Sequence, residues 1–198
     1  MAKMINTKSK IQVLGRALLQ THGYNGFSFK DIGDRLGVRK ESVFEHFKSK
    51  EDLILEILAT YTSDFHAWAK RVDPMEPLAQ IKKVFDIFYS FSSDKSKVCP
   101  VLALAVDTKI LTPKVRKALE EFVNHWLDWL ESKIAEGQQK GQVRNDLNSK
   151  ALCSLVYSAG MGSQLQARIL RKSELTLTTG ESIVKLIAAK KRERSIEN

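Results

Sequence analysis

The chain of 198 residues lacks the features that mark several classes of protein. Its two cysteines, Cys99 and Cys153, are too few for a disulfide scaffold and have no partners at metal-site spacing. Four prolines and ten glycines are too few for a fibrous or disordered chain. No apolar run approaches the ~20 residues of a membrane-spanning helix, and the first residues have no apolar signal-peptide core. We therefore expect a globular cytoplasmic protein with no membrane partner.

Motifs of catalysis are also missing. The four histidines, His22, His46, His66 and His125, have no metal-ligand spacing. The chain has neither a Gly-x-Ser-x-Gly nucleophile motif nor a phosphate-binding loop, and no carboxylate pair stands out. The sequence therefore predicts no enzyme, no catalytic residue, no metal site and no cofactor.

Positive charge is in excess, and its distribution along the chain is uneven. The net charge is +9, of which residues 1–50 contribute +6, from ten Lys/Arg less four Asp/Glu. Residues 51–184 hold 17 of each sign, and residues 185–198 add +3. A basic first quarter on a neutral body favours a surface that faces a polyanion such as nucleic acid. A solubilising charge bias is the alternative that charge alone leaves open.

Apolar residues recur at three- and four-residue spacings along almost the whole chain, and no strand-like alternation competes with them. Ser-x-x-Asp capping boxes at Ser28 and Ser49, and three prolines that suit a first helical position, mark helix starts. Thr178 begins a similar box near the C-terminus. The predicted fold class is all-α. The nine expected helices span about 6–22, 28–35, 39–45, 50–72, 77–92, 100–109, 113–138, 148–171 and 179–192.

The first three predicted helices form a compact unit. The second and third are joined by Leu36-Gly37-Val38, a short connection with a glycine, which is typical of a helix-turn-helix. The sequence thus predicts a helix-turn-helix domain at 1–49 and a second helical domain at 50–198, with helix 50–72 as the connector.

Three segments of the basic region match a known pattern in both spacing and residue type. Residues 23–33 read GYNGFSFKDIG, residues 36–38 read LGV, and residues 44–53 read FEHFKSKEDL. Together they resemble the DNA-binding signature of the TetR family of bacterial transcriptional repressors. The resemblance covers roughly residues 8–60. It implies a homodimer that binds a near-palindromic double-stranded operator and is released by a small-molecule effector in its C-terminal domain.

The resemblance also implies which residues contact DNA. Residues 39–44 correspond to the recognition helix in the major groove, where Arg39 and Lys40 can reach base edges. The resemblance implies phosphate contacts from Ser28 and Lys30 in the second helix, and from His46 and Lys50 around the start of the fourth. A helix N-terminus and a basic side chain both attract a phosphate. The implied DNA-binding residues are Ser28, Lys30, Arg39, Lys40, Glu41, Ser42, Phe44, His46 and Lys50.

Three residues depart from the family pattern. Arg39 stands where a Ser or Thr usually caps the recognition helix, Glu41 where Gly is common, and Phe44 where Tyr is common. Phe44 cannot donate a hydrogen bond to phosphate, and Glu41 is repelled by the DNA backbone unless it accepts from cytosine. The operator sequence therefore stays open. Packing is the alternative role for Phe44 and Phe47, and an ordinary surface position is the alternative for His46.

The second domain is dense in large apolar residues, most of which we expect in the core. In the resembling family the fourth to eighth helices enclose a ligand cavity. An aromatic interior without obvious buried charge favours a small apolar or aromatic effector. Packing is the alternative for each candidate. The candidate ligand-binding residues are Phe65, Trp68, Phe88, Cys99, Val101, Ala105, Trp126 and Tyr157.

Cys99 precedes Pro100 at a predicted helix start. Unpaired backbone N–H groups and the nearby Lys95 and Lys97 would stabilise a reactive thiolate. The position resembles the cysteine at the start of the sixth helix in TetR-like repressors that respond to electrophiles and oxidants. A sensor of an electrophilic effector and a structural cysteine both stay open, whereas we expect Cys153 to be packed.

Small residues gather in the helix predicted at 148–171. Glycine inside a helix costs about 1 kcal/mol against alanine, so two glycines in three positions suggest a compensating close contact. Because the resembling family dimerises through its last two helices, this face is the implied dimer interface. Close packing within one chain is the alternative. The candidate interface residues are Ser158, Ala159, Gly160, Gly162 and Ser163.

One further class of function competes with a DNA-binding regulator. A helical interaction module with a basic end could bind RNA or a membrane surface. Such a module would show no preference for a duplex DNA sequence. A DNA-binding regulator is predicted because the basic charge and the helix-turn-helix signature occur in the same segment.

Overall fold

The computed structural model describes residues 7–94 and 96–189, which contain nine helices and no strand. The all-α prediction is confirmed for this part of the chain. Within it, none of the helices is long and apolar enough to cross a membrane. The helices are α1 (Thr7–His22), α2 (Phe29–Leu36), α3 (Lys40–His46), α4 (Lys50–Val72), α5 (Pro77–Ser92), α6 (Pro100–Ala105), α7 (Pro113–Gln139), α8 (Ser149–Leu170) and α9 (Glu174–Ile187).

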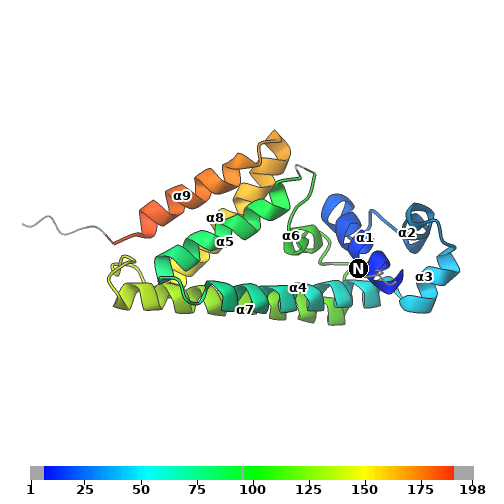
Figure 1. Cartoon of the computed structure of the whole chain (residues 1–198), viewed down its shortest axis with the longest axis horizontal. Coiled ribbons are helices and arrows are strands. Elements are labelled where there is room, and N and C mark those ends of the chain that lie inside the picture. The colour runs from blue at the N-terminus through cyan, green and yellow to red at the C-terminus, as the bar shows by residue number, and fades with distance from the viewer. Residues whose placement is uncertain (1–6, 95, 190–198) are drawn as a thin grey trace, which may run out of the picture.

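Helices α1 to α3 form a unit at one end of the molecule, and α4 runs from that unit along the other helices (Figure 1). Helix α4 packs against α1 and against α7, so it belongs to both parts of the molecule. Helices α5, α7, α8 and α9 pack on one another, and α6 packs against α1. Because α1 contacts both α4 and α6, the N-terminal unit rests on the larger helical domain at two places.

Seven helices begin and end within one residue of the predicted limits, and two do not. Helix α6 ends at Ala105, four residues earlier than predicted, and residues 106–110 form turns. Helix α9 begins at Glu174, and the capping box predicted at Thr178 is wrong. The Thr178 hydroxyl donates to the Glu174 carbonyl one turn earlier, inside the helix. The predicted end of this helix at 192 lies outside the described residues.

Two glycines let helix α5 pack closely against α8 and α9. A Cβ atom at Gly160 would overlap the Phe88 ring, and one at Gly180 would overlap the Phe85 ring. Both rings are almost fully buried. Each glycine therefore provides the space for a large aromatic side chain of α5, and this gain in packing offsets the low helix propensity of glycine.

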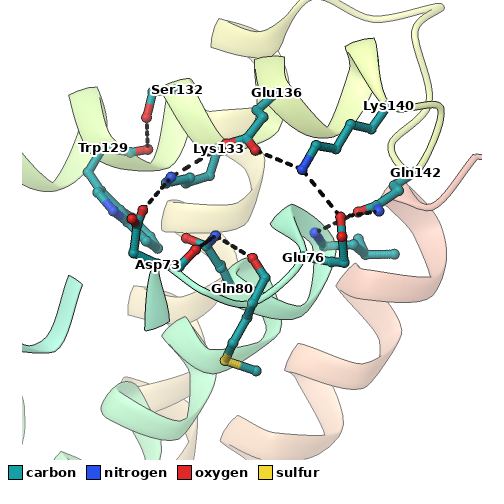
Figure 2. A network of polar contacts seen from close by, with 11 residues as sticks. Asp73, Glu76, Gln80, Trp129, Ser132, Lys133, Glu136, Lys140 and Gln142 are labelled. Atoms are coloured by element: carbon teal, nitrogen blue, oxygen red, sulfur yellow. Dashed lines mark hydrogen bonds and ion pairs between the residues drawn. The ribbon is translucent and has the colours of Figure 1, made fainter. Parts of the chain in front are cut away.

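A polar network joins the corner between α4 and α5 to α7 (Figure 2). Lys133 of α7 lies 3.2 Å from the Asp73 carboxylate and 3.4 Å from that of Glu136. Lys140 in turn bridges Glu136 and Glu76 at 3.0 and 3.4 Å. These contacts hold the C-terminal end of α4 to α7, whereas the N-terminal end of α4 carries the helix-turn-helix.

Candidate DNA-binding surface and ligand cavity

The turn between α2 and α3 depends on two glycines. Gly37 adopts a left-handed conformation at the end of α2, with φ of 68°, which glycine reaches at low cost. The Val38 N–H then donates to the Gly33 carbonyl at 3.0 Å. A Cβ atom on Gly33 would lie 2.8 Å from the Val38 carbonyl oxygen. The two glycines therefore allow the close approach that sets the direction of α3.

Helix α3 buries Val43 and exposes the basic residues at its start. Arg39 occupies the N-cap position without a side-chain capping bond, so its guanidinium is not used to start the helix. Arg39 and Lys40 form no ion pair with the described residues. Glu41 is also exposed beside them. This end of α3 can therefore present two positive charges and one carboxylate to an outside partner.

The aromatic residues of α3 and the following turn have different environments. Phe44 is 39% exposed and packs edge-on against Phe29 with ring centroids 4.9 Å apart. The Lys40 ammonium lies 5.4 Å from the Phe44 ring centroid. Phe47 is 3% exposed, which confirms a packing role for it. Phe44 both supports α2 and keeps part of its ring at the surface.

The hydroxyl of Ser28 is already used inside the chain. It caps α2 by accepting from the Asp31 N–H at 3.4 Å, and it donates to the Asp31 carboxylate at 2.6 Å. These hydrogen bonds from Ser28 lower the pKa of Asp31, whose negative charge therefore stays at this helix start. A phosphate contact by Ser28 would compete with this arrangement. Lys30, in contrast, is exposed on α2.

Lys50 holds the loop between α1 and α2. Its ammonium donates to the carbonyls of Tyr24 and Phe27, and it lies 4.0 Å from the Phe27 ring centroid. Burial lowers the pKa of Lys50, opposed by the carboxylates of Asp107 and Asp31. The structure thus assigns Lys50 an anchoring role that the sequence motif did not predict.

Two other candidate DNA-binding residues, His46 and Ser42, are half-buried on α3.

Three polar contacts tie the end of α1 to the larger domain, and sequence reasoning missed them. The Val98 N–H donates to the Gln20 carbonyl at 3.2 Å, and Arg168 of α8 donates to the Thr21 carbonyl at 2.9 Å. The Tyr24 N–H donates to the Asp107 carboxylate at 3.2 Å. No local pattern marks these residues, because each pair is separated by more than 70 positions.

A cavity of about 310 Å³ lies among helices α4 to α8 of the larger domain, and Arg16 of α1 also lines it. Seven of the eight candidate ligand-binding residues line it. Ala105 does not, because it is exposed at the end of the short helix α6 and lines a separate surface groove. The lining residues are Arg16, Tyr61, Asp64, Phe65, Ala67, Trp68, Arg71, Ile87, Phe88, Ser90, Phe91, Cys99, Pro100, Val101, Phe122, Trp126, Tyr157 and Met161.

Charged residues also line the cavity, but none of the three is buried: Arg16 is half-buried, and Asp64 and Arg71 are exposed. The Arg16 guanidinium lies 4.1 Å from the Tyr61 ring centroid and 3.6 Å from the Asp64 carboxylate. Arg71 also lines the cavity. Asp64 follows Tyr61 by three residues and Arg71 follows Asp64 by seven, so the three lie on one face of α4, a signal that could have placed them. Arg16 is on another domain and had no such signal.

Two tyrosine hydroxyls in the cavity lining, those of Tyr61 and Tyr157, are buried, and that of Tyr157 has no hydrogen-bond partner among the described residues, while that of Tyr61 lies near the Arg16 guanidinium. Burial raises the pKa of both, and for Tyr61 the charge of Arg16 partly opposes the rise. Both phenols therefore keep their protons at neutral pH. A buried polar group without a partner is costly, so the Tyr157 hydroxyl can favour a bound molecule with hydrogen-bonding groups.

The environment of Cys99 favours the structural alternative over a reactive thiolate. Burial raises the pKa of the Cys99 thiol to about 11, although the backbone N–H groups of Leu102 and Val101 oppose the rise. Lys97 is paired with Asp94 instead, and Lys95 lies outside the described residues. The helix start is present as predicted, but the removal of water outweighs its effect. Cys153 is buried on α8, as expected.

The small residues of α8 point in two directions. Gly160 and Ser163 are buried within the chain, so assigning them to a dimer interface is wrong. The Phe88 ring fills the space next to Gly160, and the Ser163 hydroxyl donates to the Gly160 carbonyl at 2.7 Å. Ser158 and Gly162 are exposed, and Ala159 is half-buried.

Comparison with known proteins agrees with this architecture. The family described as "Bacterial regulatory proteins, tetR family" matches residues 13–57, and "Tetracyclin repressor-like, C-terminal domain" matches residues 77–179. The chain belongs to the TetR family. It is thus a TetR-family transcriptional regulator, with a helix-turn-helix DNA-binding domain followed by a helical C-terminal domain.

Individual TetR-family relatives cover nearly the whole chain. The HTH-type transcriptional repressor DhaR of Mycobacterium sp. (strain GP1) is 24% identical over 161 residues, which is 81% of either chain. A TetR-family regulator from Agrobacterium tumefaciens has a TM-score of 0.86 at 23% identity, covering 92% of this chain and 97% of its own. One from Legionella pneumophila has a TM-score of 0.83 at 26% identity, covering 94% and 100%.

Proposed function

We propose that this TetR-family protein represses transcription by binding a near-palindromic operator as a homodimer, in the cytoplasm, and that a small molecule in the cavity releases it. The observation that carries the proposal is the exposed start of α3, where Arg39 and Lys40 have no ion-pair partner in the described structure. The DhaR relative is a transcriptional repressor, which supports repression over activation.

Selection of bound fragments from a random duplex pool tests sequence-specific binding. Wild type is expected to enrich a near-palindromic site. Arg39→Ala should relax the preference among sites and cost about 1–3 kcal/mol on the best site, because arginine reads guanine with two hydrogen bonds. Lys82→Ala, which removes an exposed positive charge from α5, is the control and should bind as wild type does. Equal binding of selected and random duplexes by wild type would contradict the proposal.

A stripe of exposed residues on α8 supports the homodimer. Its members recur at three- and four-residue spacings, so they lie along one face of the helix. Ile169 is 78% exposed, Leu165 45% and Leu155 39%, so the stripe exposes three large apolar side chains together, which is typical of an interaction surface. Apart from the adjacent backbone of α8, no atom of the described chain lies within 4 Å of the position that a Cβ atom of Gly162 would occupy. The stripe consists of Leu155, Ser158, Gly162, Leu165 and Ile169.

Sedimentation of a charged variant tests this interface. Ile169→Lys should give monomers and weaken operator binding, because each monomer reads only one half-site. Val106→Lys is the matched control, since Val106 is 83% exposed but lies outside α8 and α9. A dimer that survives Ile169→Lys, or that dissociates equally with Val106→Lys, would place the interface elsewhere.

The cavity supports a small apolar or aromatic effector. Its walls include the rings of Phe65 and Trp126, whose centroids are 4.4 Å apart, and of Phe88, 5.9 Å from Trp126. A neutral, buried thiol at Cys99 supports the structural alternative for that residue over a sensor of electrophiles. The effector is therefore proposed to bind without forming a bond to the protein.

A further inference from the structure

Arg16 belongs to the DNA-binding domain but lies at the ligand cavity, which the proposed function does not require. It belongs to α1 of the DNA-binding domain, yet its side chain lines the cavity, while every other lining residue comes from the larger domain or from α4. Its guanidinium stacks on Tyr61, 4.1 Å from the ring centroid. A molecule in the cavity can therefore touch the DNA-binding domain directly.

The guanidinium of Arg16 retains capacity for a ligand. It has five N–H donors, and Asp64 is its ion-pair partner in the described structure, through one contact at 3.6 Å. The Asp64 side chain is 62% exposed and that of Arg16 is 38% exposed. An ion pair so open to water is weak, so it can yield to a negative group that binds inside the cavity.

The balance of charge in the cavity lining favours a negative ligand group. Two arginines, Arg16 and Arg71, face the same space as a single carboxylate, that of Asp64. Arg71 is exposed and has no ion pair in the described part of the chain. Arg16 is the better site, because its partly buried, stacked guanidinium interacts with an anion through less water.

The aromatic walls indicate the shape of the rest of the ligand. The rings of Trp68 and Phe88 are nearly parallel to that of Trp126, with interplanar angles of 28° and 24°. Aromatic rings in such arrangements favour a flat partner. The unpartnered Tyr157 hydroxyl adds a hydrogen-bonding group to the same lining.

We propose that the effector is a flat aromatic molecule with one carboxylate-like negative group, and that Arg16 binds this group. The proposal rests on the regulator function proposed above. Because the ligand and Asp64 compete for one guanidinium, binding weakens the contact between α1 and α4. Helix α1 also packs against α2 and α3, so the ligand shifts the DNA-binding unit through Arg16 as well as through α4.

Calorimetric titration with 2-naphthoate and 2-naphthamide tests the ligand class. The two probes have nearly the same shape, and only the first is charged at pH 7. Wild type should bind 2-naphthoate at least about tenfold more tightly, because hydrogen bonds to an ionised acceptor are stronger. Arg16→Gln should lose this preference. Asp64→Asn should increase it, since the competing carboxylate is gone.

Arg71→Gln is the matched control, because it removes the other positive charge of the lining. It should keep most of the preference for 2-naphthoate. Loss of the preference in Arg71→Gln and its retention in Arg16→Gln would overturn the assignment to Arg16. Failure of wild type to bind either probe, or equal binding of both, would overturn the ligand class.

Operator titrations with and without 2-naphthoate test the coupling. In wild type the probe should lower operator affinity about 5–150-fold, the usual range of allosteric coupling. In Arg16→Gln, at a probe concentration that saturates it, this ratio should fall toward one. An unchanged ratio would overturn coupling through Arg16. If wild type selects no operator at all, the regulator function fails, while the calorimetric preference still decides the ligand class.

Discussion

The helix-turn-helix unit and the cavity present their residues in opposite ways. In the unit, short helices held by a cap and a glycine turn direct Arg39 and Lys40 outward, where no other chain segment occupies them. In the cavity, residues from six helices converge on one space. The difference shows that the candidate DNA-binding surface depends on local contacts within α2, α3 and the turn between them, whereas the cavity depends on the packing of helices that are far apart in the sequence.

The two glycines of α8 give the largest expected contrast. Gly160→Ala should lower the free energy of unfolding by about 1–3 kcal/mol, because the new methyl group overlaps the buried Phe88 ring. Gly162→Ala meets no side chain of its own protomer and, compared in the monomeric Ile169→Lys background, should raise it by up to about 1 kcal/mol through helix propensity. Denaturant titrations at one protomer concentration measure both. Equal effects of the two substitutions would show that α5 does not pack on α8 as described.

This contrast also explains what the sequence could and could not predict. Spacing identified the small residues of α8 as special, but spacing alone does not distinguish a face toward α5 from a face toward a second copy. Gly160 and Gly162 differ by two positions, about 200° around a helix, and therefore point to opposite sides. Only the position of Phe88, 72 residues earlier, decides which side is the core.

The helix starts of the N-terminal unit were predictable from the sequence because they depend on contacts between residues close together in the chain. The hydrogen bonds between Ser28 and Asp31 join residues three apart, so the pattern of residue types is sufficient. The same pattern failed at Thr178, because α9 already begins at Glu174 and the box falls within it. Seven cavity residues were predicted as aromatic or apolar positions, but Arg16 was not, since it comes from another domain.

The reactivity of Cys99 gives the next largest effect. Burial raises the pKa of its thiol from 9.0 to about 11, so at pH 7.5 its thiolate fraction is about 100-fold lower than that of an unperturbed thiol. Iodoacetamide should therefore modify Cys99 at least about 100-fold more slowly in folded protein than in denaturant. Because the pKa is raised, the rate should keep increasing with pH toward 11 instead of levelling above 9.

A Cys153→Ser variant isolates this measurement, because Cys153 also has a pKa raised by burial to about 11. The Cys153 sulfur donates to the Leu127 carbonyl at 3.4 Å, and serine can keep a donor there. If iodoacetamide modified Cys99 as fast in the folded protein as in denaturant, Cys99 would again be a candidate sensor of electrophiles. The cavity would then hold a reactive thiol and not only apolar and aromatic side chains.

Gly37 and Gly141 provide a matched pair across the two regions. Each has a φ of 68°, and in both cases no atom of the described chain beyond the glycine and its two neighbours lies within 4 Å of a new Cβ position. Alanine at either position should cost about 1–2 kcal/mol in the free energy of unfolding, from backbone conformation alone. Only Gly37→Ala should also weaken operator binding at temperatures where both variants are folded, because Gly37 sets the direction of α3. If Gly37→Ala and Gly141→Ala weakened operator binding equally, the loss would come from lower stability and not from the direction of α3.

The smallest expected effect concerns the far end of α4. The Lys133 side chain is 15% exposed and is paired with Asp73 and Glu136 (Figure 2). Lys133→Met should lower the free energy of unfolding by about 1 kcal/mol or less, since both carboxylates are open to water. Lys117→Met is the control: its pair with Glu121 is 3.8 Å long and more exposed, so its loss should have no measurable effect.

Salt separates an electrostatic role of Lys133 from a packing role. Screening weakens exposed ion pairs, so the difference between Lys133→Met and wild type should shrink between low salt and about 1 M, where the Debye length is about 3 Å. A difference independent of salt would mean that the hydrocarbon stem of Lys133, and not its charge, holds the corner between α4 and α5. In either case operator affinity should change less than with Gly37→Ala, because the corner is at the opposite end of α4 from the helix-turn-helix.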